Sequence, residues 1–156
     1  MECTKNGKKK KVGRILIHAF FILYMLVLLR ITVFRSTLSF DYLFLKGNVN
    51  LTFFESYIAL LQEKDWWNLT YLFVGNIIWF LPLGIYLSWQ GKIRKTWQIT
   101  LFGLAVSFII ESLQFVFGTG VSDVDDLVLN VFGTWCGVVL WKLLTQICDN
   151  LKNKYK

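Results

Sequence analysis

The sequence predicts an all-α integral membrane protein, a bundle of four transmembrane helices with both termini in the cytoplasm. Hydrophobic residues make up 55% of the 156 residues and aromatic residues 17%, a composition typical of membrane proteins rather than soluble globules. Four apolar segments are long enough to span a bilayer, at residues 15–34, 69–89, 97–117 and about 126–147. Each has about 20 residues, which at roughly 1.5 Å per residue covers a hydrocarbon core of about 30 Å.

The distribution of Lys and Arg predicts the orientation. Residues 1–14 contain six of them, residues 90–96 three, and the chain from Lys142 onward four, so thirteen of the seventeen fall on one side of the predicted bundle. Because cytoplasmic loops carry the excess of Lys and Arg, that side is inside. The basic run at the N-terminus adjoins a span and therefore indicates a topology anchor, with no nucleic-acid partner expected. The chain then divides into a basic cytoplasmic N-terminus (1–14), a transmembrane domain (15–147) and a basic cytoplasmic tail (148–156).

The one long connection, residues 35–68, is expected on the extracellular side. It mixes aromatic and charged residues, and residues 53–61 are predicted to form a short helix lying in the membrane interface. The first apolar segment is too long for the core of a signal peptide, so we interpret it as an uncleaved span.

Ionisable and amide side chains from all four spans lie at one predicted depth, within about 10 Å of the outer boundary at roughly 1.5 Å per residue. Ionisable residues inside membrane spans are rare and mark functional sites by default. The sequence therefore predicts one outward-facing ligand-binding site made by Arg30, Asn76, Glu111, Gln114, Asp123, Asp126 and Asn130.

Helical periodicity assigns these residues to faces. Asp126, Asn130, Gly133 and Gly137 fall on one face of the fourth span, which we expect to meet a stripe of the third span made by Ser107, Glu111, Gln114 and Gly118. The glycine pair allows close approach of another helix, either within the chain or from a second copy in a homo-oligomer. Asp125 points away from this face, and we expect it to be solvated.

Glu111 needs a partner or a proton, because an unpaired carboxylate is costly in a low dielectric. Arg30 is the nearest cation by depth, and Arg35 is a second candidate. An ion pair with Arg30 would either fix the packing of two helices or line the site. The carboxylates could also hold a divalent cation through oxygen, but no His joins them, so we expect neither a metal nor another cofactor. His18 lies far from the cluster and is interpreted as structural.

Pro82 interrupts the hydrogen bonding of the second span. The resulting kink either improves helix packing or opens an outward pocket. Both interpretations stay open at the level of the sequence.

Four motifs resemble the VanZ-like family, over residues 49–137. They are Asn50-Leu51-Thr52-x-Phe54, Asn76-x-x-x-Phe80-x-Pro82-Leu83-Gly84, Glu111-x-x-Gln114-Phe115 and Asp123-x-x-Asp126-x-x-x-Asn130-x-x-Gly133-x-x-x-Gly137. The resemblance implies a small multi-pass protein of the bacterial cell membrane. It also implies a link to low-level resistance to teicoplanin, a lipid-tailed glycopeptide, with which the founding member of the family is associated.

Three functions are compatible with these residues. The first, which we favour, is a non-enzymatic protein whose polar site engages a lipid-tailed glycopeptide or a lipid-linked cell-wall precursor, among membrane lipids. The second is a small membrane hydrolase or transferase acting on lipid-linked envelope intermediates, with Glu111, Asp123 and Asp126 as acid–base residues. The third is an accessory structural subunit in which polar residues only hold helices together.

Overall fold

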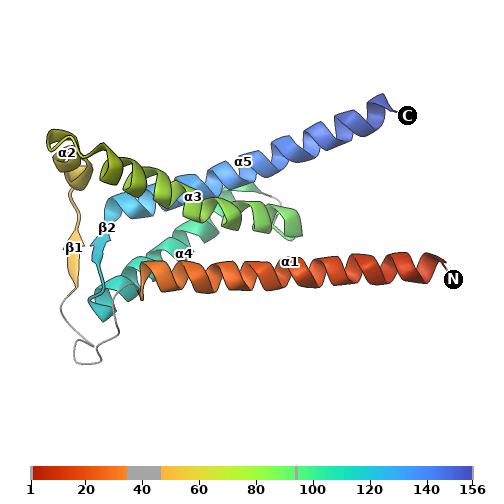
Figure 1. Ribbon diagram of the computed structural model, residues 1–156, viewed down its shortest axis with the longest axis horizontal. Helices are drawn as coiled ribbons and strands as arrows, with labels where there is room; N and C mark the ends of the chain where they lie inside the picture. Colours follow the sequence, from red (N-terminus) through yellow and green to blue (C-terminus); the bar gives the residue numbers. More distant parts are fainter. Residues whose placement is uncertain (1, 35–46, 94, 156) are drawn as a thin grey trace.

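The computed structural model describes residues 2–34, 47–93 and 95–155, which form four long helices, one short helix and two short strands (Figure 1). The four long helices are all long and apolar enough to cross a membrane, so the predicted four-span bundle is confirmed. Arg35, the second candidate partner of Glu111, lies outside the described residues. In chain order the elements are α1 Glu2–Thr32, β1 Asn48–Asn50, α2 Glu55–Gln62, α3 Trp66–Gln90, α4 Thr96–Phe117, β2 Val121–Asp123 and α5 Val124–Lys154.

Both chain ends lie at one end of the bundle, while α2, β1 and β2 lie at the opposite end (Figure 1). This arrangement fits four spans, because an even number of crossings returns the chain to its starting side. We call the end that carries α2, β1 and β2 the outer end, after the orientation predicted from Lys and Arg; the side of the membrane itself stays a prediction. The predicted short helix is present in the outer loop as α2.

The two strands form a small parallel sheet that the all-helical prediction did not contain. Asn48 pairs with Val121, Val49 with Ser122 and Asn50 with Asp123. The strands come from the long outer loop and from the turn between α4 and α5, more than seventy residues apart in sequence. Each has only three residues, too few to produce a periodic pattern that sequence analysis could detect.

The closest helix packing is between α3 and α5, where glycines bring the two backbones together. A Cβ atom at any of these glycines would meet a backbone carbonyl of the facing helix: Gly84 faces Thr134, Gly133 faces Ile77 and Gly137 faces Leu81. The expectation that the glycine pair meets the third span is therefore wrong, since both glycines face the second span. Within the chain, both glycines are buried against α3; a homo-oligomer stays a prediction. Small residues at such crossings let van der Waals contacts form over a large area, the main source of helix association in lipid.

Pro82 lies inside α3, which continues without interruption from Trp66 to Gln90. Proline cannot donate to the carbonyl of Ile78 one turn earlier. The hydroxyl of Tyr24, on α1, donates a hydrogen bond to the neighbouring carbonyl of Trp79. This contact ties α1 to α3 at the level where the helix ladder is incomplete.

The buried apolar core joins α1, α3 and α4. It consists of Leu28, Val33, Phe80, Leu83 and Ile110. Many other large apolar side chains on the spans are exposed on the bundle surface, as expected for helices that face lipid rather than water.

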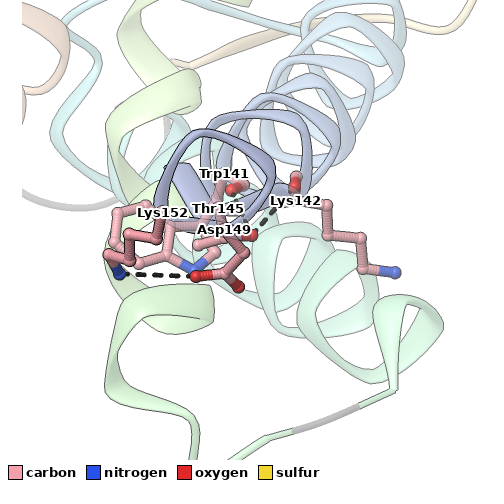
Figure 2. A network of polar contacts seen from close by, with 5 residues as sticks. All are labelled: Trp141, Lys142, Thr145, Asp149 and Lys152. Carbon is pink, nitrogen blue, oxygen red and sulfur yellow. Dashed lines mark hydrogen bonds and ion pairs between the residues drawn. The ribbon is translucent and has the colours of Figure 1, made fainter. Parts of the chain in front are cut away.

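The distal part of α5 shows polar contacts of an ordinary exposed helix (Figure 2). The hydroxyl of Thr145 donates to the carbonyls of Trp141, at 3.1 Å, and Lys142, at 2.8 Å. Lys152 and Asp149 form an ion pair at 3.4 Å, with both side chains at least 70% exposed. It is the only ion pair found among residues 11–34, 47–93 and 95–155, whose side chains the structure describes, and such exposed pairs contribute little to stability.

Candidate ligand-binding site

Glu111 lies at the outer end of α4, where it meets the start of α5. Its side chain is only 4% exposed. The backbone N–H of Asp123 donates a hydrogen bond of 3.1 Å to Oε2 of Glu111. This contact joins the third span to the turn that precedes the fourth span, so among the described residues the carboxyl group is held by a backbone N–H.

The predicted ion pair between Glu111 and Arg30 is not formed. Arg30 is exposed, and its guanidinium donates to the carbonyl of Phe34 at the end of its own helix. A long cationic side chain near a helix end can extend to the membrane interface and remain hydrated there. Among the residues the structure places, Arg30 is therefore not part of the cluster around Glu111.

Asp123 connects the small sheet to α5. As the N-cap of that helix, its side chain accepts the N–H of Asp125 at 2.9 Å, which satisfies one of the free donors at a helix start. Its other oxygen accepts the side-chain amide of Asn50 at 3.1 Å and, at 3.5 Å, the hydroxyl of Ser56. One carboxylate thus holds together β1, the region of α2 and the start of α5.

Asp125 is buried, contrary to the expectation that it is solvated. Only 1% of its surface is exposed, and its Oδ2 accepts the backbone N–H of Phe54 at 2.7 Å. Phe54 precedes α2 and has a left-handed backbone conformation, with φ of 59°, which is unusual for a bulky residue. Asp125 therefore anchors the outer loop. Periodicity assigned it correctly to a face away from Asp126, but the loop that covers this face is remote in sequence.

Asp126 and Asn130 are on the face of α5 that points into the bundle. The amide nitrogen of Asn76, on α3, donates to Oδ1 of Asp126 at 2.5 Å. The amide nitrogen of Asn130 donates to the hydroxyl of Ser107, on α4, at 2.9 Å. The fourth span thus contacts the second span through Asp126 and the third span through Asn130. The second of these contacts is the one expected between the Asn130 face and the Ser107 stripe.

Gln114 links α4 to the end of α1. Its side-chain nitrogen donates to the carbonyl of Thr32 at 3.2 Å. Its oxygen, Oε1, is buried and has no hydrogen-bond partner in the described part of the chain. A buried acceptor of this kind is costly unless water or a ligand supplies a donor.

These side chains surround a cavity of about 190 Å³ at the outer end of the bundle. Five of the seven predicted site residues line it, namely Asn76, Glu111, Gln114, Asp126 and Asn130. Asp123 does not line it; its backbone N–H instead donates a hydrogen bond to Glu111. The margin of the cavity is formed by exposed side chains that include Ile31, Tyr71, Leu72 and Trp79. Pro82 is not a lining residue, so the structure does not support a role for it in opening this pocket.

Several residues of this region were not predicted as site residues. Asn50 and Phe54 were visible only as part of a loop motif, and Ser107 only as a member of the polar stripe on the third span. Ser56 gave no signal, because serine is common in loops. Tyr57, on α2, is 6% exposed; burial, together with the nearby Asp126 carboxylate, raises the pKa of its hydroxyl, which therefore stays protonated. Only pairing the polar residues of segments that are distant in sequence could have identified these residues.

The site offers carboxylate, amide and hydroxyl groups in a partly apolar pocket. No group of three or more His, Cys, Asp or Glu side chains suited to a metal ion occurs in the described ranges. His18 contacts the hydroxyl of Tyr86 at 2.7 Å and does not line the cavity. The arrangement is suited to holding hydrogen-bond donors near the outer end of the bundle.

Four membrane-spanning helices with one polar cavity define a multi-pass membrane protein. The chain belongs to the VanZ/LLP1 family, whose model matches residues 21–145. Protein VanZ of Enterococcus faecium is 27% identical over 145 residues, which cover 90% of this chain and 83% of that protein. No solved structure matches the chain.

Proposed function

We propose that this VanZ-like protein acts in the bacterial cell membrane by engaging, at the cavity lined by Glu111 and Asp126, a lipid-tailed glycopeptide or a lipid-linked cell-wall precursor. Teicoplanin resistance is the phenotype that its similarity to Protein VanZ suggests. Binding without turnover is the favoured activity.

The observation that carries the proposal is the composition of the cavity wall. Its inner part is polar, with Glu111 and Asp126, while its margin includes the exposed side chains of Ile31, Leu72 and Trp79. An amphiphile in the outer leaflet presents both kinds of surface at once, an acyl chain towards lipid and a polar group towards the cavity. Ligand pockets generally combine an apolar lining with a few placed polar groups.

The cavity is small compared with a whole glycopeptide, because ligand pockets for drug-sized molecules have volumes of about 300–1,000 Å³, against about 190 Å³ here. The proposal is therefore that one polar group of the amphiphile enters the cavity, while the remainder of the molecule stays in the leaflet and above it.

The test compares susceptibility to teicoplanin and to vancomycin in an otherwise identical host with and without this gene. We expect the gene to protect against teicoplanin and not against vancomycin, since only teicoplanin carries a lipid tail. Glu111→Gln and Asp126→Asn should each return susceptibility to that of the gene-free strain at unchanged protein abundance. Both variants keep an oxygen that can accept the existing hydrogen bond, from Asp123 in one case and Asn76 in the other.

Glu63→Gln is the matched control, because it removes one carboxylate from an exposed position in the outer loop. Wild-type resistance in both site variants would refute the proposal. Reduced abundance of the variants would instead favour an accessory subunit held together by these residues, and turnover of a lipid-linked substrate would favour the enzyme.

A further inference from the structure

Among the described residues, the cavity is lined by two acidic side chains and by no basic one. Glu111 and Asp126 both face it, and no Lys, Arg or His is found among its described lining residues. Arg30, the nearest cation by depth in α1, is exposed and bound to the carbonyl of Phe34. An anion entering the cavity would therefore meet like charges in a medium of low dielectric, where their repulsion is strong.

The amide groups of the cavity also present acceptors. The nitrogens of Gln114 and Asn76 donate to a backbone carbonyl and a carboxylate, respectively. Because neither of these partners can donate, both amide orientations are determined, and the amide oxygens are left for other contacts. Oε1 of Gln114 is buried without a partner among the residues described.

Asn130 provides a second unfilled acceptor. Its side chain is 4% exposed and lines the cavity. Its nitrogen donates to Ser107 at 2.9 Å, whereas its Oδ1 is buried with no partner in the placed segments. Native proteins rarely leave such atoms unpaired, so this oxygen is suited to accept a donor from water or from a ligand.

The start of α5 is a described feature that favours an anion. A helix N-terminus carries the equivalent of about half a positive charge. At this helix, however, Asp123 already caps the N–H of Asp125, and Asp125 and Asp126 occupy the first turn. Three carboxyl groups therefore already lie at the positive end of the α5 dipole, which makes this helix start less suited to an anion.

We propose that the cavity holds the protonated amine of an amphiphile, by accepting its N–H groups on the Glu111 and Asp126 carboxylates and on the free oxygens of Gln114 and Asn130. This deepens the proposed function and rests on it for the physiological setting. An ammonium group has three donors and no acceptor, so three of these four acceptor groups are enough to satisfy it. A phosphate or pyrophosphate group carries the opposite charge and mainly acceptors, so we expect these residues to favour the ammonium group over it.

The experiment measures binding to the full-length protein in nanodiscs of phosphatidylcholine, with empty nanodiscs subtracted. Three labelled probes share one acyl chain and differ only in the head group: decylammonium, decyl phosphate and decyl maltoside. We expect decylammonium to bind at least about tenfold more tightly than decyl phosphate, because opposite and like charges interact with the carboxylates with opposite sign. The neutral maltoside should also bind more weakly than the amine.

Glu111→Gln and Asp126→Asn should each weaken decylammonium binding about tenfold, while Glu63→Gln leaves it unchanged. Equal or tighter binding of decyl phosphate or decyl maltoside by the wild-type protein would overturn the inference, and this comparison needs no variant. Unchanged decylammonium binding in both site variants would overturn it as well. Failure of the proposed function is a separate result, namely equal teicoplanin susceptibility with and without the gene, whichever probe binds.

Discussion

The outer end of the bundle and the crossing of α3 with α5 join the same helices by opposite means. At the crossing, Gly84, Gly133 and Gly137 remove side chains so that backbones touch. At the outer end, Asn76 and Asp126 keep the same two helices connected through a side-chain hydrogen bond of 2.5 Å. The backbone contact at the crossing leaves no space for a ligand, whereas the side-chain contact at the outer end leaves space beside it for a cavity.

This difference separates stability from function along one pair of helices. Backbone contact cannot adapt to a ligand, because a shift of either helix breaks many contacts at once. Side chains that reach across a gap can exchange a partner for a ligand with little movement of the helices. The crossing is therefore expected to set the distance between α3 and α5, and the polar end to use that distance for binding.

The largest effect is expected from filling the crossing. Gly137→Val places a branched side chain where even a Cβ atom would meet the carbonyl of Leu81. Since backbone cannot move aside as a flexible side chain can, we expect the destabilisation to reach the upper part of the usual range for overpacking, about 3 kcal/mol. Thermal unfolding in detergent and abundance in membranes measure it.

Gly75→Ala is the matched control on α3, because a Cβ atom there would meet nothing within 4 Å. It should leave stability unchanged or increase it by up to about 1 kcal/mol through helix propensity. If Gly137→Val accumulates and unfolds like the wild type, the close crossing is not what holds the bundle together.

A smaller effect is expected at the buried carboxylate of the outer end. Asp125→Ala removes the acceptor of the Phe54 N–H, and the loss of a hydrogen bond to a charged group costs about 1.5–3 kcal/mol. We expect faster amide exchange at Phe54 and in α2, with the crossing unaffected. Asp125→Asn should lose less stability because it keeps an acceptor. Asp149→Ala, which removes an exposed carboxylate from the tail, should change neither stability nor amide exchange.

The smallest effect is expected at the two-stranded sheet. Asn50→Ala removes the amide that bonds Asp123 and the oxygen that accepts the N–H of Thr52. These hydrogen bonds are partly exposed, so we expect the free energy of unfolding to fall by about 1–2 kcal/mol. Amide exchange in β1 and β2 should become faster. Asn48→Ala, at an exposed position of the same strand, serves as the control; equal protection in the two variants would show that the Asn50 side chain does not hold the sheet.

Much of the architecture could be predicted because its signals are local. Hydropathy located the four spans, and helical periodicity put Asn130 on the face that meets Ser107. The depth argument brought Glu111, Asp126 and Gln114 to one level, and they do line one cavity. It failed for Arg30, because depth does not determine in which direction a long exposed side chain extends.

The sequence by itself determined that polar groups gather near one end of a membrane bundle, since both the span length and the helix period follow from neighbouring residues. Only the tertiary structure decided which helix covers the glycines, that β1 pairs with β2, and that Asp125 is buried under the outer loop. Those features depend on segments about fifty to seventy residues apart. Their pairing depends on how the whole chain folds, and no pattern among neighbouring residues predicts it.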